Sequence, residues 1–140
     1  LVPLGTPISF ILQQLGTAPE ANEVILGGPM MGFTQVGFDV PVVRGTSGLL
    51  LLREEDVTNN PEGPCIRCAR CVQACPMNLL PTAIAAYARR SLVEETEEYC
   101  AMDCIECGSC SYVCPANIPL VQSIRLGKAA VLAKKRKALL

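Results

Sequence analysis

The sequence contains neither histidine nor tryptophan, and aromatic residues make up only 4% of its 140 residues. Without histidine, the chain cannot form Rieske-type clusters or zinc sites that use imidazole ligands. Its 12 basic residues are balanced by 13 acidic ones, so it has no excess of positive charge for a nucleic-acid backbone. It also has few aromatic side chains that could stack on bases. We therefore expect no nucleic-acid partner.

Long hydrophobic runs are missing as well. The uninterrupted apolar stretches, such as Leu49 to Leu52, are short. A transmembrane helix needs about 20 mostly apolar residues, which is far longer. We therefore expect that the chain does not span a bilayer. Neither a nucleophile–base pair nor a phosphate-binding glycine loop is recognisable, so we assign no catalytic residue. The sequence opens at Leu1 rather than at a methionine, which is consistent with a fragment of a longer protein.

Cysteine, by contrast, is abundant. The chain has nine cysteines, and eight of them fall into two short runs, residues 65–76 and 104–115. The odd number and the crowding do not suit a disulfide framework, and no signal peptide opens the sequence. We therefore expect a reducing compartment and metal ligation. Each run is followed by an asparagine and a proline, so the chain contains an internal repeat that extends past the cysteines.

Each run has the spacing C-x2-C-x2-C-x3-C-P, which is typical of ferredoxins with two 4Fe-4S clusters. In that pattern, three cysteines of one run and the last cysteine of the other bind the same cluster. We predict that cluster I is bound by Cys65, Cys68, Cys71 and Cys114. We predict that cluster II is bound by Cys104, Cys107, Cys110 and Cys75. Clusters that exchange ligands in this way must be neighbours, so electrons can pass between them by tunnelling.

A zinc-stapled structural or interaction module is the alternative, because thiolates also bind Zn2+. Zinc sites usually pair two C-x2-C units across a longer gap, whereas two duplicated four-cysteine runs favour iron–sulfur clusters. A third possibility is an iron–sulfur domain that only stabilises its neighbours. Within the favoured electron relay, Arg67 and Arg70 flank cluster I and Glu106 flanks cluster II. These charges are either simply solvated or tune the clusters. In the second case, we hypothesise that cluster I has the higher potential and lies on the electron-accepting side.

Three further features have competing interpretations. Cys100 lies four residues before Cys104, which would put both on one face of a helix. We interpret Cys100 as a small buried hydrophobe rather than as an alternative ligand or a redox-sensitive thiol. We interpret residues 27–32 as tight glycine turns with core methionines rather than a ligand loop. The basic C-terminal stretch predicts an amphipathic helix that is either solvated or docked on anionic lipid or on acidic partner subunits.

The composition divides the chain into two parts. Before residue 60, the apolar runs at residues 24–26, 40–43 and 49–52 predict strands, and residues 8–15 predict a helix that ends at Gly16. The polar segment 54–64 is a candidate linker. After Cys65, we predict helices over residues 80–91, 94–102 and about 119–138. The predicted fold class is therefore α+β, with a small strand-rich region (1–60) followed by a mainly helical two-cluster ferredoxin domain (61–140).

Four stretches of the sequence resemble the C subunit of the Rnf ion-translocating electron transport complex, namely residues 24–32, 39–48, 64–81 and 103–128. The resemblance covers most of the chain from residue 22 onward. It implies that residues 1–60 are the end of a β-grasp and barrel-like region. It also implies that residues 61–140 form the two-cluster ferredoxin domain, which ends in a basic helix.

The resemblance implies a function for the chain. Such subunits are peripheral, lie on the cytoplasmic side of the cell membrane, and relay electrons between NAD(H) and ferredoxin-linked subunits, coupled elsewhere to Na+ or H+ translocation. We therefore expect the partners to be other subunits of a membrane redox complex and ferredoxin-type or flavin electron donors and acceptors. The FMN and NAD(H) sites of the family lie in an upstream domain that this chain lacks, so no residue here is assigned to either cofactor.

Overall fold

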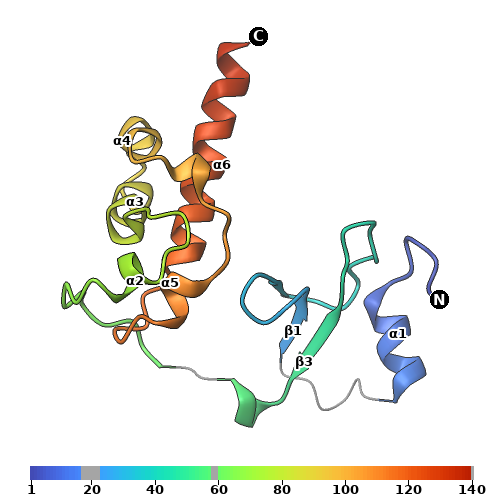
Figure 1. Cartoon of the computed structure of the whole chain (residues 1–140). Helices are drawn as coiled ribbons and strands as arrows, with labels where there is room; N and C mark the ends of the chain where they lie inside the picture. Colours follow the sequence, from blue (N-terminus) through green and yellow to red (C-terminus); the bar gives the residue numbers. More distant parts are fainter. Residues whose placement is uncertain (17–22, 58–59, 140) are drawn as a thin grey trace. The chain divides into compact units, whose positions relative to one another are not determined.

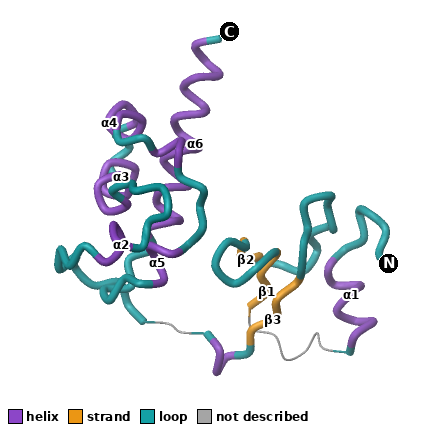
Figure 2. Tube along the Cα trace, viewed as in Figure 1, coloured by secondary structure: helices purple, strands orange, loops and turns teal. Residues whose placement is uncertain are grey.

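The computed structural model describes residues 1–16, 23–57 and 60–139. The chain divides into two compact units, Leu1–Asn59 and Asn60–Leu140 (Figure 1). The described part of the first unit contains an α-helix, a small sheet and a short 3-10 helix (Glu54–Asp56), whereas that of the second is mainly helical (Figure 2). The fold is therefore α+β, as the sequence predicts. The assignment of residues 1–60 to a β-grasp and barrel-like domain stays a prediction.

Helix α1 (Ile8–Leu15) has the bounds that the sequence predicts. It begins after Pro7 and ends at Gly16, whose φ of 69° is the left-handed conformation that glycine adopts at low cost. The side chains of Ile8 and Leu12 are fully buried and form a small core with Val24 of the sheet. This apolar stripe, spaced four residues apart, fixes α1 against one face of the sheet.

Among the described residues, the sheet has the strand order β2-β1-β3. The central strand β1 (Glu23–Leu26) pairs antiparallel with β2 (Phe33–Gln35) and with β3 (Leu49–Leu52). Strands β1 and β3 lie where the sequence predicts them. Strand β2 was not predicted, because it has only three residues and its pairing depends on the turn that precedes it.

That turn, residues 27–32, depends on its glycines. Gly27 has a φ of 108°, and a Cβ atom on Gly32 would lie 2.6 Å from the carbonyl oxygen of Gly28. The tight-turn interpretation is therefore confirmed. The interpretation of the methionines as core residues is wrong, because the side chains of Met30 and Met31 are exposed.

Residues 40–43, predicted as a strand, do not form one. Pro41 forms only an isolated bridge with Pro7, and the neighbouring amide of Val42 donates to the carbonyl oxygen of Thr6 over 2.9 Å. Because proline has no N–H group, Pro41 cannot continue a ladder of hydrogen bonds. The β-branched run therefore gives an extended segment beside the start of α1 rather than a strand of the sheet.

The second unit contains two longer helices and several short ones in its described residues. Their bounds are α2 (Arg70–Gln73), α3 (Pro81–Arg89), α4 (Val93–Glu98), a 3-10 helix (Ala101–Asp103), α5 (Ser109–Tyr112) and α6 (Leu120–Ala138). Pro81 is the first residue of α3, where its missing N–H costs nothing. No helix within these described ranges is both long enough and apolar enough to cross a membrane.

The predicted helix over residues 94–102 is shorter than expected, and this changes the place of Cys100. Helix α4 ends at Glu98, and Cys100 has a left-handed φ of 58° that breaks the helix before Cys104. The two cysteines therefore do not share a helical face. Cys100 is also exposed, so its interpretation as a buried hydrophobe is wrong.

Helix α6 is the central support of the second unit, and α3 and α4 pack beside it (Figure 1). Its side chains at Leu120, Ile124 and Val131 are almost completely buried. At Gly127 the helices approach so closely that a Cβ atom would lie 2.8 Å from both Ala88 of α3 and Thr96 of α4. This packed helical layer carries the two cysteine loops at one end of α6.

Candidate iron–sulfur site

The two cysteine runs fold with the same backbone conformation. Each run, taken with the asparagine that follows it, has three left-handed residues at equivalent positions. These are Arg67, Ala69 and Asn78 for the first run and Glu106, Gly108 and Asn117 for the second. A one-turn helix follows the second left-handed residue in each run, α2 in the first and α5 in the second. Non-glycine residues rarely adopt this conformation and do so mainly where the surrounding structure enforces it. The internal repeat is therefore a repeat of structure as well as of sequence.

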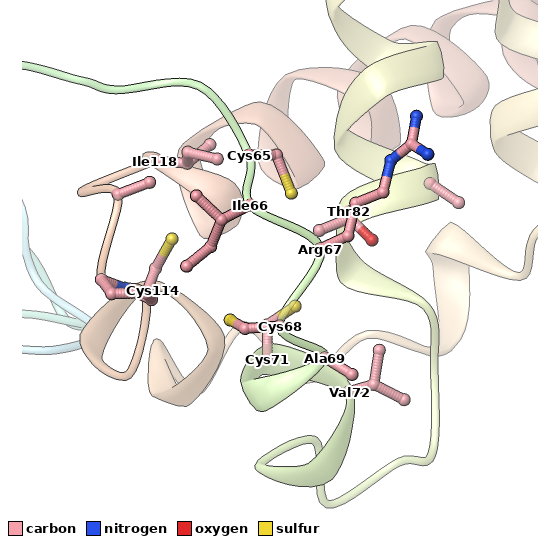
Figure 3. A pocket seen from close by; sticks show the side chains of 13 residues that line it. Cys65, Ile66, Arg67, Cys68, Ala69, Cys71, Val72, Thr82, Cys114 and Ile118 are labelled. Carbon is pink, nitrogen blue, oxygen red and sulfur yellow. The ribbon is translucent and has the colours of Figure 1, made fainter.

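Four predicted ligands of cluster I surround one cavity. It has a volume of about 410 Å³ and is lined by Cys65, Cys68, Cys71 and Cys114 (Figure 3). The first three come from the first run, and Cys114 comes from the second. Cys65 and Cys68 are exposed, whereas Cys71 is buried. Ile66, Val72 and Ile118 give the cavity apolar walls.

The other four predicted ligands surround a second, smaller cavity. It has a volume of about 20 Å³ and is lined by Cys75, Cys104, Cys107 and Cys110. Here Cys75 comes from the first run and the other three come from the second. All four are at least partly buried, and Val121 and Ile124 of α6 also line the cavity.

The structure thus gathers the eight motif cysteines into the two sets of four that the spacing groups together. In each set, the last cysteine of one run lies with the first three cysteines of the other. That these sets bind clusters stays a prediction. Each run contributes to both sets because of its short helix, α2 or α5. The helix holds a buried cysteine that lines one cavity, and the next cysteine, one turn later, lines the other cavity.

The donor set and its surroundings fit iron–sulfur clusters. Thiolates are the ligands of such clusters, and the apolar lining of both cavities suits a buried cofactor. Within the described ranges, no three or more His, Cys, Asp or Glu side chains form a group that could hold a single metal ion. The thiolates of a 4Fe-4S cluster each bind a different iron, so they are more widely spaced than the ligands of one ion.

Burial controls the protonation of several of these thiols. It raises the pKa of Cys110 to about 11, and it also raises the pKa of Cys71 and of Cys104. Hydrogen bonding with Ser109 instead lowers the pKa of Cys107. Because clusters bind thiolates, binding a cluster must displace the protons that burial keeps on Cys71, Cys104 and Cys110.

Two backbone amides donate hydrogen bonds to sulfur atoms of the second set. The amide of Leu79 lies 3.4 Å from Sγ of Cys75, and the amide of Glu106 lies 3.4 Å from Sγ of Cys104. Such bonds stabilise negative charge on the sulfur and raise the potential of a bound cluster.

Glu106 anchors the second cysteine loop to α6. Its carboxylate accepts a hydrogen bond from Arg125 at 3.0 Å and forms an ion pair with Lys128 at 2.7 Å. Lys128 also donates to the carbonyl oxygen of Cys104 over 2.7 Å. The hydrogen bond from Lys128 lowers the pKa of Glu106. We call Glu106, Arg125 and Lys128 the Glu106 clamp.

The clamp alters the charge around the second site. In the sequence, Glu106 is a negative charge beside the predicted cluster II, but Arg125 and Lys128 bring two positive charges to the same place. Glu106 therefore does not support a lower potential for cluster II. Sequence reasoning missed Arg125 and Lys128, because they lie about 20 residues away in α6. The only signal was that Glu106 replaces the arginine found at the equivalent position of the first run.

The first cysteine loop is held differently. Arg89 of α3 donates to Glu62, with Nη2 and Oε2 3.3 Å apart, and to Ser123 of α6 over 2.8 Å. This bridge fixes the chain just before Cys65. Arg67 and Arg70, in contrast, are exposed. No hydrogen bond or ion pair of their side chains occurs with the residues that the structure describes.

The basic end of α6 contacts acidic residues of the chain itself. Lys134 pairs with Glu94 of α4 over 2.6 Å, and Lys135 pairs with Glu97 over 2.8 Å. The hydrogen bond from Lys134 lowers the pKa of Glu94. Part of the predicted basic face is therefore used inside the second unit.

Comparisons with known proteins agree with this geometry. Residues 64–118 match the 4Fe-4S dicluster domain family. The chain is 46% identical over 137 residues to the C subunit of the Na(+)-translocating ferredoxin:NAD(+) oxidoreductase complex of Acetobacterium woodii, an alignment that covers 97% of the chain and 31% of that protein. It is 46% identical over 131 residues to the C subunit of the proton-translocating ferredoxin:NAD(+) oxidoreductase complex of Clostridium ljungdahlii, covering 92% of the chain and 29% of the relative.

A third relative carries a more general name. The chain is 49% identical over 132 residues to the C subunit of the ion-translocating oxidoreductase complex of Erwinia tasmaniensis, covering 93% of the chain and 16% of that protein. The chain therefore spans less than a third of the length of each of these relatives. Similarity extends over both units of the chain and includes both cysteine runs.

Proposed function

We propose that this chain relays electrons through two 4Fe-4S clusters. The proposal is supported by its similarity to the C subunits of ion-translocating oxidoreductase complexes and by its match to the 4Fe-4S dicluster domain family. Cys65, Cys68, Cys71 and Cys114 would hold cluster I, and Cys75, Cys104, Cys107 and Cys110 would hold cluster II. The observation that supports this proposal most strongly is the division of the eight cysteines between two cavities, four to each.

The clusters would supply one-electron transfer, and the residues of this chain would hold them next to each other. Cys71 and Cys75 are separated by a single turn around α2 and belong to different sets. Cys110 and Cys114 are related in the same way by α5. Two covalent connections of one turn each therefore set the separation of the clusters. The buried core that includes Cys71 and Cys110 excludes water between them.

The wider role rests on what the relatives are named. We propose that the chain is part of a peripheral subunit of a membrane-associated NAD(H)/ferredoxin oxidoreductase coupled to ion translocation, on the cytoplasmic side of the membrane. Its partners would be the other subunits of that complex. The FMN and NAD(H) sites would lie in a further domain of a longer protein. Contact of the basic end of α6 with anionic lipid is a finer proposal, supported by the exposed Arg136 and Lys137.

The test is anaerobic purification followed by counting iron, sulfide and zinc, and by electron paramagnetic resonance (EPR) of the dithionite-reduced protein. The proposal predicts about eight irons per chain, no stoichiometric zinc and signals from two interacting clusters. Stoichiometric zinc in a colourless protein would instead establish the zinc-stapled module. Iron–sulfur clusters that no one-electron donor reduces would establish a purely structural role.

A further inference from the structure

The two cysteine sites differ in how far they are open to solvent, and this difference carries an inference that rests on the proposed function. Cys65 and Cys68 of the first site are exposed, whereas every cysteine of the second site is at least partly buried. The side chain of Ile66, between the two exposed cysteines, is 67% exposed. Electron tunnelling to another protein requires a cofactor near the surface, so the first site is the one that an external redox centre can approach.

The surface around the first site is basic. Arg67 lines its cavity, and Arg70 follows two residues after Cys68. A neighbouring groove of about 320 Å³ shares Cys65 and Thr82 with that cavity and is lined by Arg90. The acidic residue in this groove, Glu62, is already paired with Arg89. Arg67 at this apolar opening, Arg90 in the neighbouring groove and Arg70, one residue after Ala69 of the cavity lining, are all exposed. None of the three is paired with a carboxylate among the described residues.

Comparison with the second cysteine loop shows that the fold does not require an arginine at the position of Arg67. At the position equivalent to Arg67 it carries Glu106, which is engaged inside the chain by Arg125 and Lys128. The same left-handed backbone thus accepts an arginine in one run and a glutamate in the other. Arg67 is not needed to form the loop, and its exposed guanidinium is available for a partner.

We infer that the exposed surface at the first site, made of Ile66 and Arg67 at the cavity with the neighbouring Arg70 and Arg90, is the docking surface for an acidic one-electron carrier protein, which exchanges electrons with cluster I. Carboxylates of the carrier face the arginines, and its redox centre lies over the apolar opening. One electron leaves the reduced carrier and reduces cluster I, with no bond made or broken. Cluster II, enclosed by α6 and the Glu106 clamp, exchanges electrons only through cluster I on this side of the molecule.

The experiment measures electron transfer from a reduced plant-type 2Fe-2S ferredoxin, an acidic one-electron carrier, to the cluster-loaded oxidised chain by stopped-flow absorbance. The test variant carries Arg67→Glu and Arg70→Glu. The matched control carries Arg136→Glu and Lys137→Glu, two exposed basic residues at the far end of α6. Both variants change the net charge equally. Rates are compared at ionic strengths of about 0.02 M and about 0.5 M, because the higher salt screens exposed charges.

At low ionic strength, the test variant should be slower than the wild type by about 10-fold or more, and the control should stay within about two-fold. At high ionic strength, the three rates should converge. Equal slowing of both variants would show an effect of net charge alone and would overturn the inference. So would slowing that persists at high salt together with a shifted midpoint potential, which would assign the arginines to tuning of the cluster.

Two further measurements separate the remaining outcomes. Iron counts and dithionite reduction of each protein test the proposed function itself. If the wild-type protein had no reducible clusters, the proposed function would be wrong, and the docking surface would be wrong with it. Sedimentation analysis tests whether the surface binds a second copy of the chain instead, and flotation with phosphatidylserine vesicles tests whether it binds anionic lipid. If Arg67→Glu with Arg70→Glu abolished a dimer or vesicle binding while the ferredoxin rate stayed unchanged, the carrier assignment would be wrong.

Discussion

At the scale of the residue, the two cysteine runs differ in charge at one equivalent position, which is Arg67 in the first run and Glu106 in the second. Arg67 is exposed and lines the first cavity (Figure 3). Glu106, at the equivalent position of the second run, is held by two cations of α6. The Glu106 clamp is only 17% to 28% exposed, so water screens it weakly. Breaking one member leaves a partly buried charge without its partner, which usually costs more than the pair itself contributes.

Replacing Lys128 by Met should therefore destabilise the second cysteine loop. The change removes the ion pair with Glu106 and the hydrogen bond to the carbonyl oxygen of Cys104. We expect a loss of about 1 to 3 kcal/mol, seen as a lower melting temperature of the cluster-loaded protein at a fixed scan rate. Lys137→Met, an exposed change in the same helix, is the control. Equal melting temperatures for the two variants would contradict the role of the clamp.

Cys100 is the one cysteine that lines neither cavity. Its exposed thiol should react with iodoacetamide in the intact cluster-loaded protein, while the eight ligand cysteines are protected. Replacing Cys100 by Ser should leave the iron and sulfide content unchanged and abolish this labelling. Loss of about half of the iron in the Ser variant would show instead that Cys100 serves as a ligand.

At the scale of the element, helix α6 joins the cysteine sites to the rest of the second unit. Its first turns line the second cavity through Val121 and Ile124, its middle packs on α3 and α4 at Gly127, and its last turns pair with α4. Its apolar positions follow helical spacing and made the helix predictable. Its function as a clamp for the second loop was not, since that depends on contacts between residues distant in the sequence.

Replacing Gly127 by Ala tests the helix crossing. Helix propensity alone would favour Ala by up to about 1 kcal/mol. The added Cβ, however, would lie 2.8 Å from Ala88 and from Thr96, a clash typical of overpacked cores. We therefore expect a net loss of about 1 to 2 kcal/mol in thermal unfolding. Ala129→Gly, at another position of the same helix, should cost no more than about 1 kcal/mol. Stabilisation by Gly127→Ala would contradict the close crossing.

The ion pair between α4 and α6 should give a pH-dependent contribution to stability. The pKa of Glu94 is lowered below its ordinary value of 4.5 by the hydrogen bond from Lys134. A carboxylate with a lowered folded pKa contributes stability that is present above its unfolded pKa and lost as pH falls through its folded pKa. Glu94→Gln should therefore melt below the wild type at pH 7, and the gap should close as the pH falls below 4.5.

The control for this pair is Glu98→Gln, an exposed residue of the same helix. Its melting temperature should follow that of the wild type more closely at every pH. A Glu94→Gln gap that stays constant as the pH falls from neutral to well below the ordinary carboxyl pKa would show that the lost stability comes from packing or helix propensity rather than from the charge pair.

The elements differ in how far the sequence could predict them. Helix α1 and strand β3 were predicted with the observed bounds, because a stripe at helical spacing and an apolar run each specify their conformation locally. Residues 40–43 failed as a strand because Pro41 removes a donor, and residues 94–102 failed as one helix because Cys100 turns left-handed. The cysteine grouping was predictable from spacing alone, since the repeat encodes it. The openness of the first site was not, because it depends on what packs around each loop.

At the scale of the whole molecule, the second unit has the form that the proposed electron relay requires. Its exposed end is the first site, its buried end is the second site, and the short helices α2 and α5 connect them. The similarity to C subunits of ion-translocating complexes and the 4Fe-4S dicluster domain agree with that form. The central claim is that the last cysteine of each run binds the cluster of the other run, because that exchange is what makes the two clusters neighbours.

Two double variants with equal numbers of lost thiols test this claim most directly. Cys75→Ala with Cys104→Ala removes two members of the same set, whereas Cys75→Ala with Cys65→Ala removes one member of each. Iron counting and EPR should show one intact 4Fe-4S cluster, about four irons, in the first variant and no intact 4Fe-4S cluster in the second. If the first variant lost both clusters while the second kept one intact, each run would bind its own cluster and the exchange of ligands would be wrong.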